Sequence, residues 1–165
     1  MKKMILALLV ALPLSAFAQK FGHFNSGEVI QAMPEYTAAQ SEIAAQSKQY
    51  EDELKRMQDE LRTKADDYQK NEATMVDVVK QRRMQELQDL NQRLEQYYQT
   101  SQQEISKLQS TKLAEISDKV SAAVKEIGVS GGYVYIMDVT AGIPFISETL
   151  STDVTAQVKA KLGLK

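Results

Sequence analysis

The stretch that decides the fold lies between residues 35 and 127 and includes IAAQSKQYEDELKRMQDELRTKADDY (residues 43–68). The 93 residues from Glu35 to Ile127 contain neither glycine nor proline. Because these two residues are the strongest helix breakers, their absence over this length predicts very long helices. Short segments of β-prone sequence flank the stretch on both sides. We therefore predict an α+β fold with a long helical arm on a small β-rich base.

Two seams of apolar residues follow the arm at helical spacing. The first comprises Ile43, Ser47, Tyr50, Leu54, Met57, Leu61, Lys64 and Tyr68. Its steps alternate between four and three residues, which is typical of a coiled coil. The second comprises Leu87, Leu90, Leu94, Tyr97, Ser101, Ile105, Leu108, Lys112, Ile116 and Val120. Steps of four become frequent in the second seam, and such steps unwind a left-handed supercoil and straighten the helix.

A turn is expected where the two seams meet, because they do not join smoothly. Residues 69–73 are polar apart from Ala73, and residues 74–77 (TMVD) resemble a capping box with a carboxylate at the last position. These features predict an antiparallel, coiled-coil-like hairpin over residues 35–127 with its turn near residues 69–73. The alternative is one uninterrupted helix of about 140 Å. The hairpin is favoured because it brings the β-like ends together, and short strands are hard to stabilise alone.

Residues 19–34 are predicted to form the first part of the base. Lys20–Phe24 has the sequence of a short strand, and Asn25 then precedes a helix start, with Glu28 three residues further on. Pro34 interrupts this early helix or bends its first turns.

Residues 128–165 are predicted to form the rest of the base. Gly128 fits the end of the long helix. Two strands are expected at residues 133–137 and 143–146, the second at a sheet edge because it contains Pro144. A last helix is expected to begin at residues 151–153, where Ser, Thr and Asp precede an apolar spacing of four.

Residues 1–18 have the pattern of a secretory signal peptide. A basic start at Lys2 and Lys3 precedes an apolar run, and Ala16-Phe17-Ala18 fits the small-x-small cleavage pattern. We therefore expect export and cleavage after Ala18. The absence of cysteine excludes a lipid-modified cysteine at that site, disulfides, thiol catalysis and cysteine-based metal sites.

The charge balance argues against a nucleic-acid partner. The formal net charge is −2, and loss of Lys2 and Lys3 with the signal peptide makes it −4. Just past the proposed turn, however, Lys80, Arg82 and Arg83 form a basic cluster. The ordinary interpretation of this tip patch is a solvated helix face. The alternative is a patch that contacts anionic partners or, weakly, a membrane surface.

The sequence offers no convincing catalytic or metal site. Residues 128–132 (GVSGG) contain G-x-S-x-G, but a nucleophile elbow needs a strand before it and a helix after it, and here the order is reversed. His23 is the single histidine, so a metal site with several converging ligands is not supported. The phosphate-loop pattern is absent as well. We therefore predict a protein that is not an enzyme and uses no cofactor.

Two groups of apolar residues lie outside the seams. The candidate contacts of the arm are Met75, Val78, Met84 and Tyr98, which offer adaptable apolar surface if they face outward. The candidate assembly residues of the base are Tyr133, Val134, Tyr135, Ile136 and Met137. Residues 19–34 and 128–165 number only 54, too few for a comfortable independent core, and short strands leave edges that another subunit can cover.

The order of these parts resembles the Skp (OmpH-like) family of periplasmic chaperones. The resemblance rests on the signal peptide, KFGHFN (residues 20–25) followed by EVIQ (28–31), the hairpin, YVYIMD (133–138) and DVT (153–155). It implies a homotrimer with a β-rich body, in which three hairpins enclose a cavity for unfolded outer-membrane proteins. It also implies a periplasmic location and an ATP-independent holdase, whose clients the arm residues above would contact. The rival interpretation is a structural coiled-coil spacer or adhesin stalk of the cell envelope.

One property of the family does not transfer to this sequence. Its best-known members are basic, whereas this chain is acidic. Lys80, Arg82 and Arg83 only loosely resemble the residues proposed for lipopolysaccharide in the family. We therefore do not predict lipopolysaccharide binding.

Overall fold

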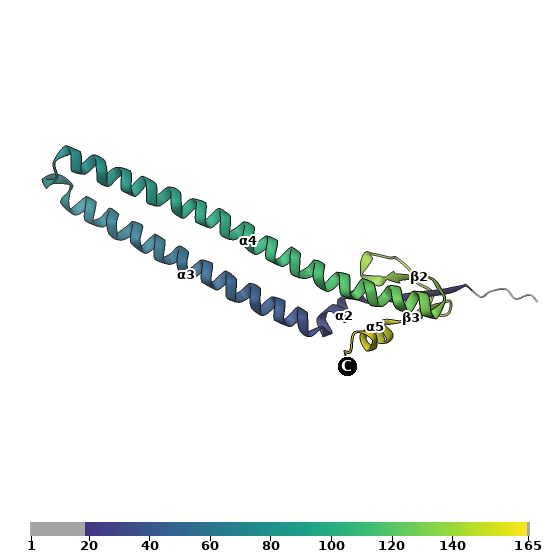
Figure 1. The fold of residues 1–165 in the computed structure, drawn as a ribbon. Helices are drawn as coiled ribbons and strands as arrows, with labels where there is room; N and C mark the ends of the chain where they lie inside the picture. The colour runs from purple at the N-terminus through teal and green to yellow at the C-terminus, as the bar shows by residue number, and fades with distance from the viewer. Residues whose placement is uncertain (1–18, 165) are drawn as a thin grey trace, which may run out of the picture. The chain divides into compact units, whose positions relative to one another are not determined.

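The structure is a computed structural model that describes residues 19–164 (Figure 1). The expected signal peptide and its cleavage site lie outside the described residues. The chain divides into two compact units, of which one comprises residues 30–119 and the other comprises the segments on either side. We refer to them as the hairpin unit and the base unit. A long helical hairpin and a small three-stranded sheet confirm the α+β class.

Two long helices build the hairpin unit. Helix α3 spans Pro34–Asn71 and helix α4 spans Asp77–Gly131, so that α4 contributes to both units. The two helices run antiparallel and side by side (Figure 1). Pro34 occupies the first turn of α3, where its missing N–H costs no helical hydrogen bond. It separates α3 from the short helix α2, Ser26–Ala32, as the sequence predicts.

The connection between the arms begins at Glu72, inside the predicted range of residues 69–73, and extends beyond it. Helix α3 continues to Asn71, whose side-chain amide donates to the carbonyl oxygen of Asp67 at 2.9 Å. The turn is the 3₁₀ segment η1, Glu72–Thr74. The expected capping box does not form, because the Thr74 hydroxyl donates backwards to the carbonyl of Asn71 at 2.9 Å. The polar residues 69–73 therefore include the end of helix α3 as well as the start of the connection.

The base unit contains a parallel sheet with the strand order β2-β1-β3. Its strands are β1 (Lys20–Phe24), β2 (Tyr133–Asp138) and β3 (Ser151–Asp153). The first two agree with the predicted strands. The predicted strand at residues 143–146 is wrong, because that segment pairs with neither neighbour and β1 instead accepts residues 151–153.

Two helix boundaries in the base unit also differ from expectation. Helix α4 passes through Gly128 and ends at Gly131, where Gly132 adopts a left-handed φ of 67°. That conformation, which glycine adopts without strain, is the actual stop signal. The last helix, α5, spans Thr155–Lys161 and so begins after the segment that forms β3.

The core of the base unit is small and mostly aliphatic. Val29 of α2, together with Val154 and Val158 around α5, is fully buried. Helix α4 adds a buried stripe at spacings of three and four residues, consisting of Val120, Ala123 and Ile127. Burial of each valine contributes about 1.5–3 kcal/mol.

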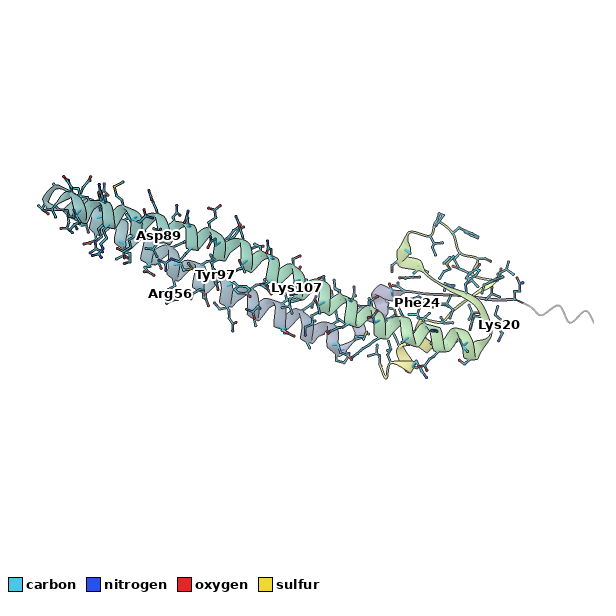
Figure 2. The ribbon with its side chains drawn as sticks, turned by 45° about the horizontal axis from the view of Figure 1, so that its top comes forward. Lys20, Phe24, Arg56, Asp89, Tyr97 and Lys107 are labelled. Carbon is cyan, nitrogen blue, oxygen red and sulfur yellow. The ribbon has the colours of Figure 1, made fainter. Side chains whose placement is uncertain are left out.

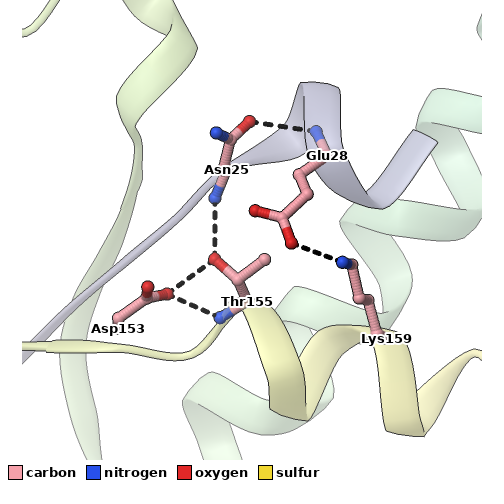
Figure 3. Close-up of polar contacts among 5 residues, drawn as sticks. All are labelled: Asn25, Glu28, Asp153, Thr155 and Lys159. Carbon is pink, nitrogen blue, oxygen red and sulfur yellow. Dashed lines mark hydrogen bonds and ion pairs between the residues drawn. The ribbon is translucent and has the colours of Figure 1, made fainter. Parts of the chain in front are cut away.

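Polar contacts tie the carboxyl ends of β1 and β3 to the helices that follow (Figure 3). The Asn25 side chain accepts a hydrogen bond from the Glu28 N–H at 3.0 Å, which confirms the predicted cap. The Asn25 N–H donates to the Thr155 hydroxyl at 3.0 Å, and that hydroxyl donates to Asp153 at 2.6 Å. An ion pair between Lys159 and Glu28 links α5 to α2 at 2.5 Å.

Candidate functional site

The hairpin is held by a thin seam rather than by a thick core. Both predicted seams lie along the less exposed sides of their helices, and every member is buried or half-buried. Full burial in α4 of the hairpin unit is confined to Leu90, Ser101 and Ile116. Tyr50 and Tyr97 meet edge to face with ring centroids 5.9 Å apart. Most of the hairpin's side chains therefore remain open to solvent (Figure 2).

Three ion pairs join the two arms across the seam. Lys112 lies 2.8 Å from Glu42, Lys119 lies 2.9 Å from Glu35, and Lys64 pairs with Glu86. The hydrogen bond from Lys119 lowers the pKa of Glu35, and the hydrogen bond from Lys64 lowers the pKa of Glu86. The hydrogen bond to Glu42 raises the pKa of Lys112. These pairs are solvent-accessible, so they add little stability and chiefly set the register of the arms.

Three of the four candidate arm contacts are exposed. Val78, Met84 and Tyr98 expose 77%, 49% and 52% of their surface, whereas Met75 is half-buried in the connection. Leu113, which was not among the predicted contacts, is 52% exposed. Leu113 and Tyr98 each follow a seam residue directly. This position next to the seam predicts exposure for Leu113 as it does for Tyr98.

The three candidate basic residues do not form one uniform patch. Lys80 is half-buried on the seam side of α4, and Arg83 pairs with Glu86 at 3.1 Å. Arg82 and Arg83 line a shallow hollow that also contains carboxylates and a third arginine; its lining comprises Val79, Arg82, Arg83, Gln85, Glu86, Asp89 and Arg93. This surface is thus of mixed charge. Figure 2 labels one of its residues, Asp89.

The candidate assembly residues form β2, which lies at one edge of the sheet. Val134, Tyr135 and Met137 are about half exposed, and Tyr135 stacks on Phe21 with ring centroids 4.8 Å apart. Beside them the segment between η2 (Val139–Ala141) and β3 closes an apolar hollow of about 280 Å³. Its wall includes Phe145, which is 78% exposed. A unit this small thus exposes a large share of its apolar side chains.

The serine and the histidine singled out by the sequence have different hydrogen-bond partners. Ser130 lies inside α4, and its hydroxyl donates to the carbonyl of Glu126 at 2.8 Å. His23 Nδ1 is 2.8 Å from the hydroxyl of Ser151, across β1 and β3. Among residues 19–164, no group of three or more histidine, aspartate or glutamate side chains is placed to hold a metal ion. Within the same range, no helix is both long enough and apolar enough to cross a membrane.

Comparison with known proteins identifies the family. A search of curated proteins found no match. Among solved structures, a protein from Caulobacter crescentus CB15, described as an OmpH-like outer membrane chaperone, has the same fold with a TM-score of 0.75. The two are 15% identical, and the match covers 87% of this chain and 83% of that one. A family model described as outer membrane protein (OmpH-like) matches residues 20–162. The chain therefore belongs to the OmpH-like family.

Proposed function

We propose that this protein is an ATP-independent periplasmic holdase, which binds unfolded outer-membrane proteins between helical arms. Membership of the OmpH-like family supports a chaperone role. The observation that carries the proposal is the hairpin itself, because it places large exposed apolar side chains such as Tyr98 and Leu113 on helices held by a thin seam. Each such side chain gives a client a weak apolar contact, because burying part of its surface is favourable.

The mechanism we propose is multivalent. The large exposed apolar side chains of the hairpin lie in its connection and on α4, where Met84, Tyr98 and Leu113 are widely spaced, so each contact with a client is weak and short-lived. Several such contacts on linked arms raise the effective concentration of one binding site for the next, which gives avidity without a rigid complex. A client held in this way stays mobile and leaves when folding into the membrane becomes more favourable.

We further propose that three copies assemble through their base units. The support is the open edge of β2 together with the exposed apolar residues next to it, Val134 and Phe145. An unpaired strand edge and an uncovered apolar surface are both stabilised by a partner subunit. Val134→Glu should therefore yield monomers in multi-angle light scattering. Val78→Glu places the same charge at a more exposed valine of the hairpin and should leave the mass unchanged. A trimeric Val134→Glu variant at micromolar concentration would exclude this edge as the assembly site.

The chaperone role is tested by suppression of aggregation. A urea-unfolded outer-membrane β-barrel protein is diluted into buffer with and without the mature chain, and light scattering is followed over time. A holdase keeps the barrel protein in solution without ATP. A structural spacer of the envelope, which is the rival function, leaves its aggregation unchanged.

A further inference from the structure

The exposed sides of α4 in the hairpin unit differ in character. One side carries nine exposed residues at steps of three and four: Met84, Gln88, Asn91, Glu95, Tyr98, Gln102, Ser106, Gln109 and Leu113. We call it the neutral flank, because Glu95 is its single charged member. A stripe on the opposite side, the charged flank, comprises Arg82, Glu86, Asp89, Arg93, Gln96, Thr100, Glu104, Lys107, Thr111 and Glu115.

The hollows of the hairpin follow the same division. Leu113 and Gln109 of the neutral flank line a mostly apolar hollow of about 180 Å³ with Tyr36, Gln40 and Ile43 of α3. Its single charged lining residue is Lys112, which also lines one of the hollows on the other side. Two other hollows open on the charged flank, and both are lined by ion-paired residues. The first contains the carboxylates of Glu86 and Asp89 and three arginines, and the second contains the ion pairs of Glu35 with Lys119 and of Glu42 with Lys112, beside Glu115.

We propose that the neutral flank is the surface on which the arm takes an extended, uncharged segment of an unfolded polypeptide that carries large apolar side chains. This inference rests on the proposed function and assigns it to one side of the arm. The distribution of charge favours the neutral flank for this occupant. An apolar segment on the charged flank would remove water from several ion pairs, and that desolvation is unfavourable.

The spacing along the flank also fits an extended chain. Met84 and Tyr98 are separated by about 21 Å along the helix, and Tyr98 and Leu113 by about 22 Å. An extended polypeptide covers such a distance in about six or seven residues. A partner helix, in contrast, needs an apolar residue every 3.5 positions or so, and the neutral flank is too sparse for that.

The residues between the apolar positions can form hydrogen bonds with the unpaired backbone of an unfolded client. Asn91, Gln102 and Gln109 each present an amide with two donors and one acceptor oxygen. An unfolded segment has unpaired N–H and C=O groups, which such amides satisfy without selecting a particular sequence. Apolar side chains spaced along the arm with amides between them therefore bind many clients weakly.

Cross-linking from matched positions tests which flank carries the client. Because the chain has no cysteine, Gln102→Cys and Gln96→Cys each give one attachment site, and both glutamines are exposed on α4. Each variant is labelled with a benzophenone maleimide and irradiated with a urea-unfolded, eight-stranded outer-membrane β-barrel protein freshly diluted into buffer. The neutral-flank label at position 102 should cross-link several times more barrel protein. Equal yields, or a higher yield at position 96, would overturn the proposal.

Affinity for the same barrel protein gives a second test. The double variant Tyr98→Ser with Leu113→Ser should raise Kd about tenfold, as expected for the loss of two partly buried apolar contacts. Glu104→Ser with Lys107→Ser, on the charged flank, leaves the net charge unchanged and should keep Kd within about twofold. Circular dichroism verifies that both variants remain helical.

The two proposals fail in different ways. An unchanged Kd in the Tyr98 and Leu113 variant, with binding by the unmodified chain intact, overturns the neutral flank and leaves the holdase function standing. Absence of binding by the unmodified chain overturns the holdase function and the neutral flank together. If the double variant loses helicity, the cross-linking yields from positions 102 and 96 decide.

Discussion

Two aspartates of the base unit, Asp138 and Asp153, accept hydrogen bonds from the first residues of helices α2 and α5. Hydrogen bonds from the hydroxyl and N–H of Thr155, at 2.6 and 2.8 Å, lower the pKa of Asp153. Partial burial alone would raise the pKa of Asp138, but the hydrogen bonds from Ser26 and Thr140 outweigh it and lower that pKa as well. Both carboxylates therefore stabilise the fold in their ionised form.

The sign of these pKa shifts predicts an acid-sensitive base unit. A carboxyl whose pKa is lower in the folded state contributes stability that is complete above its unfolded pKa of about 4 and is lost as the pH falls through the folded value. Asp153→Asn keeps an acceptor oxygen for Thr155 but removes its charge, so it should lower the free energy of unfolding by about 1 kcal/mol at pH 7 and by less at pH 3. Urea denaturation from pH 7 to pH 3 measures this. The control is Asp118→Asn, an exposed aspartate of α4; an equal loss in both variants would contradict the role of Asp153.

At the scale of single elements, the sequence predicted what is periodic and missed what depends on distant partners. The seams, Asn25 as a cap and the strand at residues 133–137 all follow from local pattern. The third strand does not, because residues 151–153 become a strand only where β1 offers them a parallel edge. Residues 143–146 have the stronger β propensity yet remain unpaired, since tertiary context overrides propensity. The exposure of the candidate arm contacts was predicted in part, because exposure one position off a seam depends on how closely the two helices approach. Their contact with clients stays a prediction.

The end of α4 provides a matched pair of glycines. Gly132 has a φ of 67°, so Gly132→Ala should destabilise the protein by about 1–2 kcal/mol through backbone strain, although no atom lies within 4 Å of the added Cβ. Gly128 lies inside the helix, where an added Cβ meets Ile136 at an ordinary 3.7 Å. Gly128→Ala should therefore stabilise by about 0.5–1 kcal/mol. Thermal unfolding of both variants measures the difference, and a destabilising Gly128→Ala would place the helix end at Gly128 instead.

The connection between the arms predicts where the hairpin accepts extra residues. Insertion of Gly-Ser after Asn71 lengthens an exposed connection, which costs little loop entropy, so stability should change by less than about 1 kcal/mol. The same insertion after Leu94 shifts the seam beyond it and separates pairs such as Tyr50 with Tyr97. That variant should lose several times more stability in urea denaturation. Comparable losses from the two insertions would contradict a hairpin with its turn at residues 72–74.

For the whole molecule, the two units combine different kinds of stability. The base unit has buried valines and a central strand, β1, that is paired on both sides. The hairpin unit has a thin seam and solvent-accessible ion pairs. Regions with few buried contacts open locally at low free-energy cost, and binding surfaces are drawn from such regions. Arms that flex while the base stays folded suit the capture of clients that differ in length.

Hydrogen exchange with mass spectrometry tests this division of roles. Exchange should be fastest at residues 72–76, slower along α3 and α4, and slowest in β1, because each opening must break the contacts that bury the amide. A urea-unfolded outer-membrane β-barrel protein should then slow exchange in residues 84–113 of α4 and leave β1 and β2 nearly unchanged. The arms gain protection because a bound client makes their local opening costlier, in proportion to its occupancy. Protection confined to β2 would mean instead that clients pair with the open strand edge, and the arms would then serve another purpose.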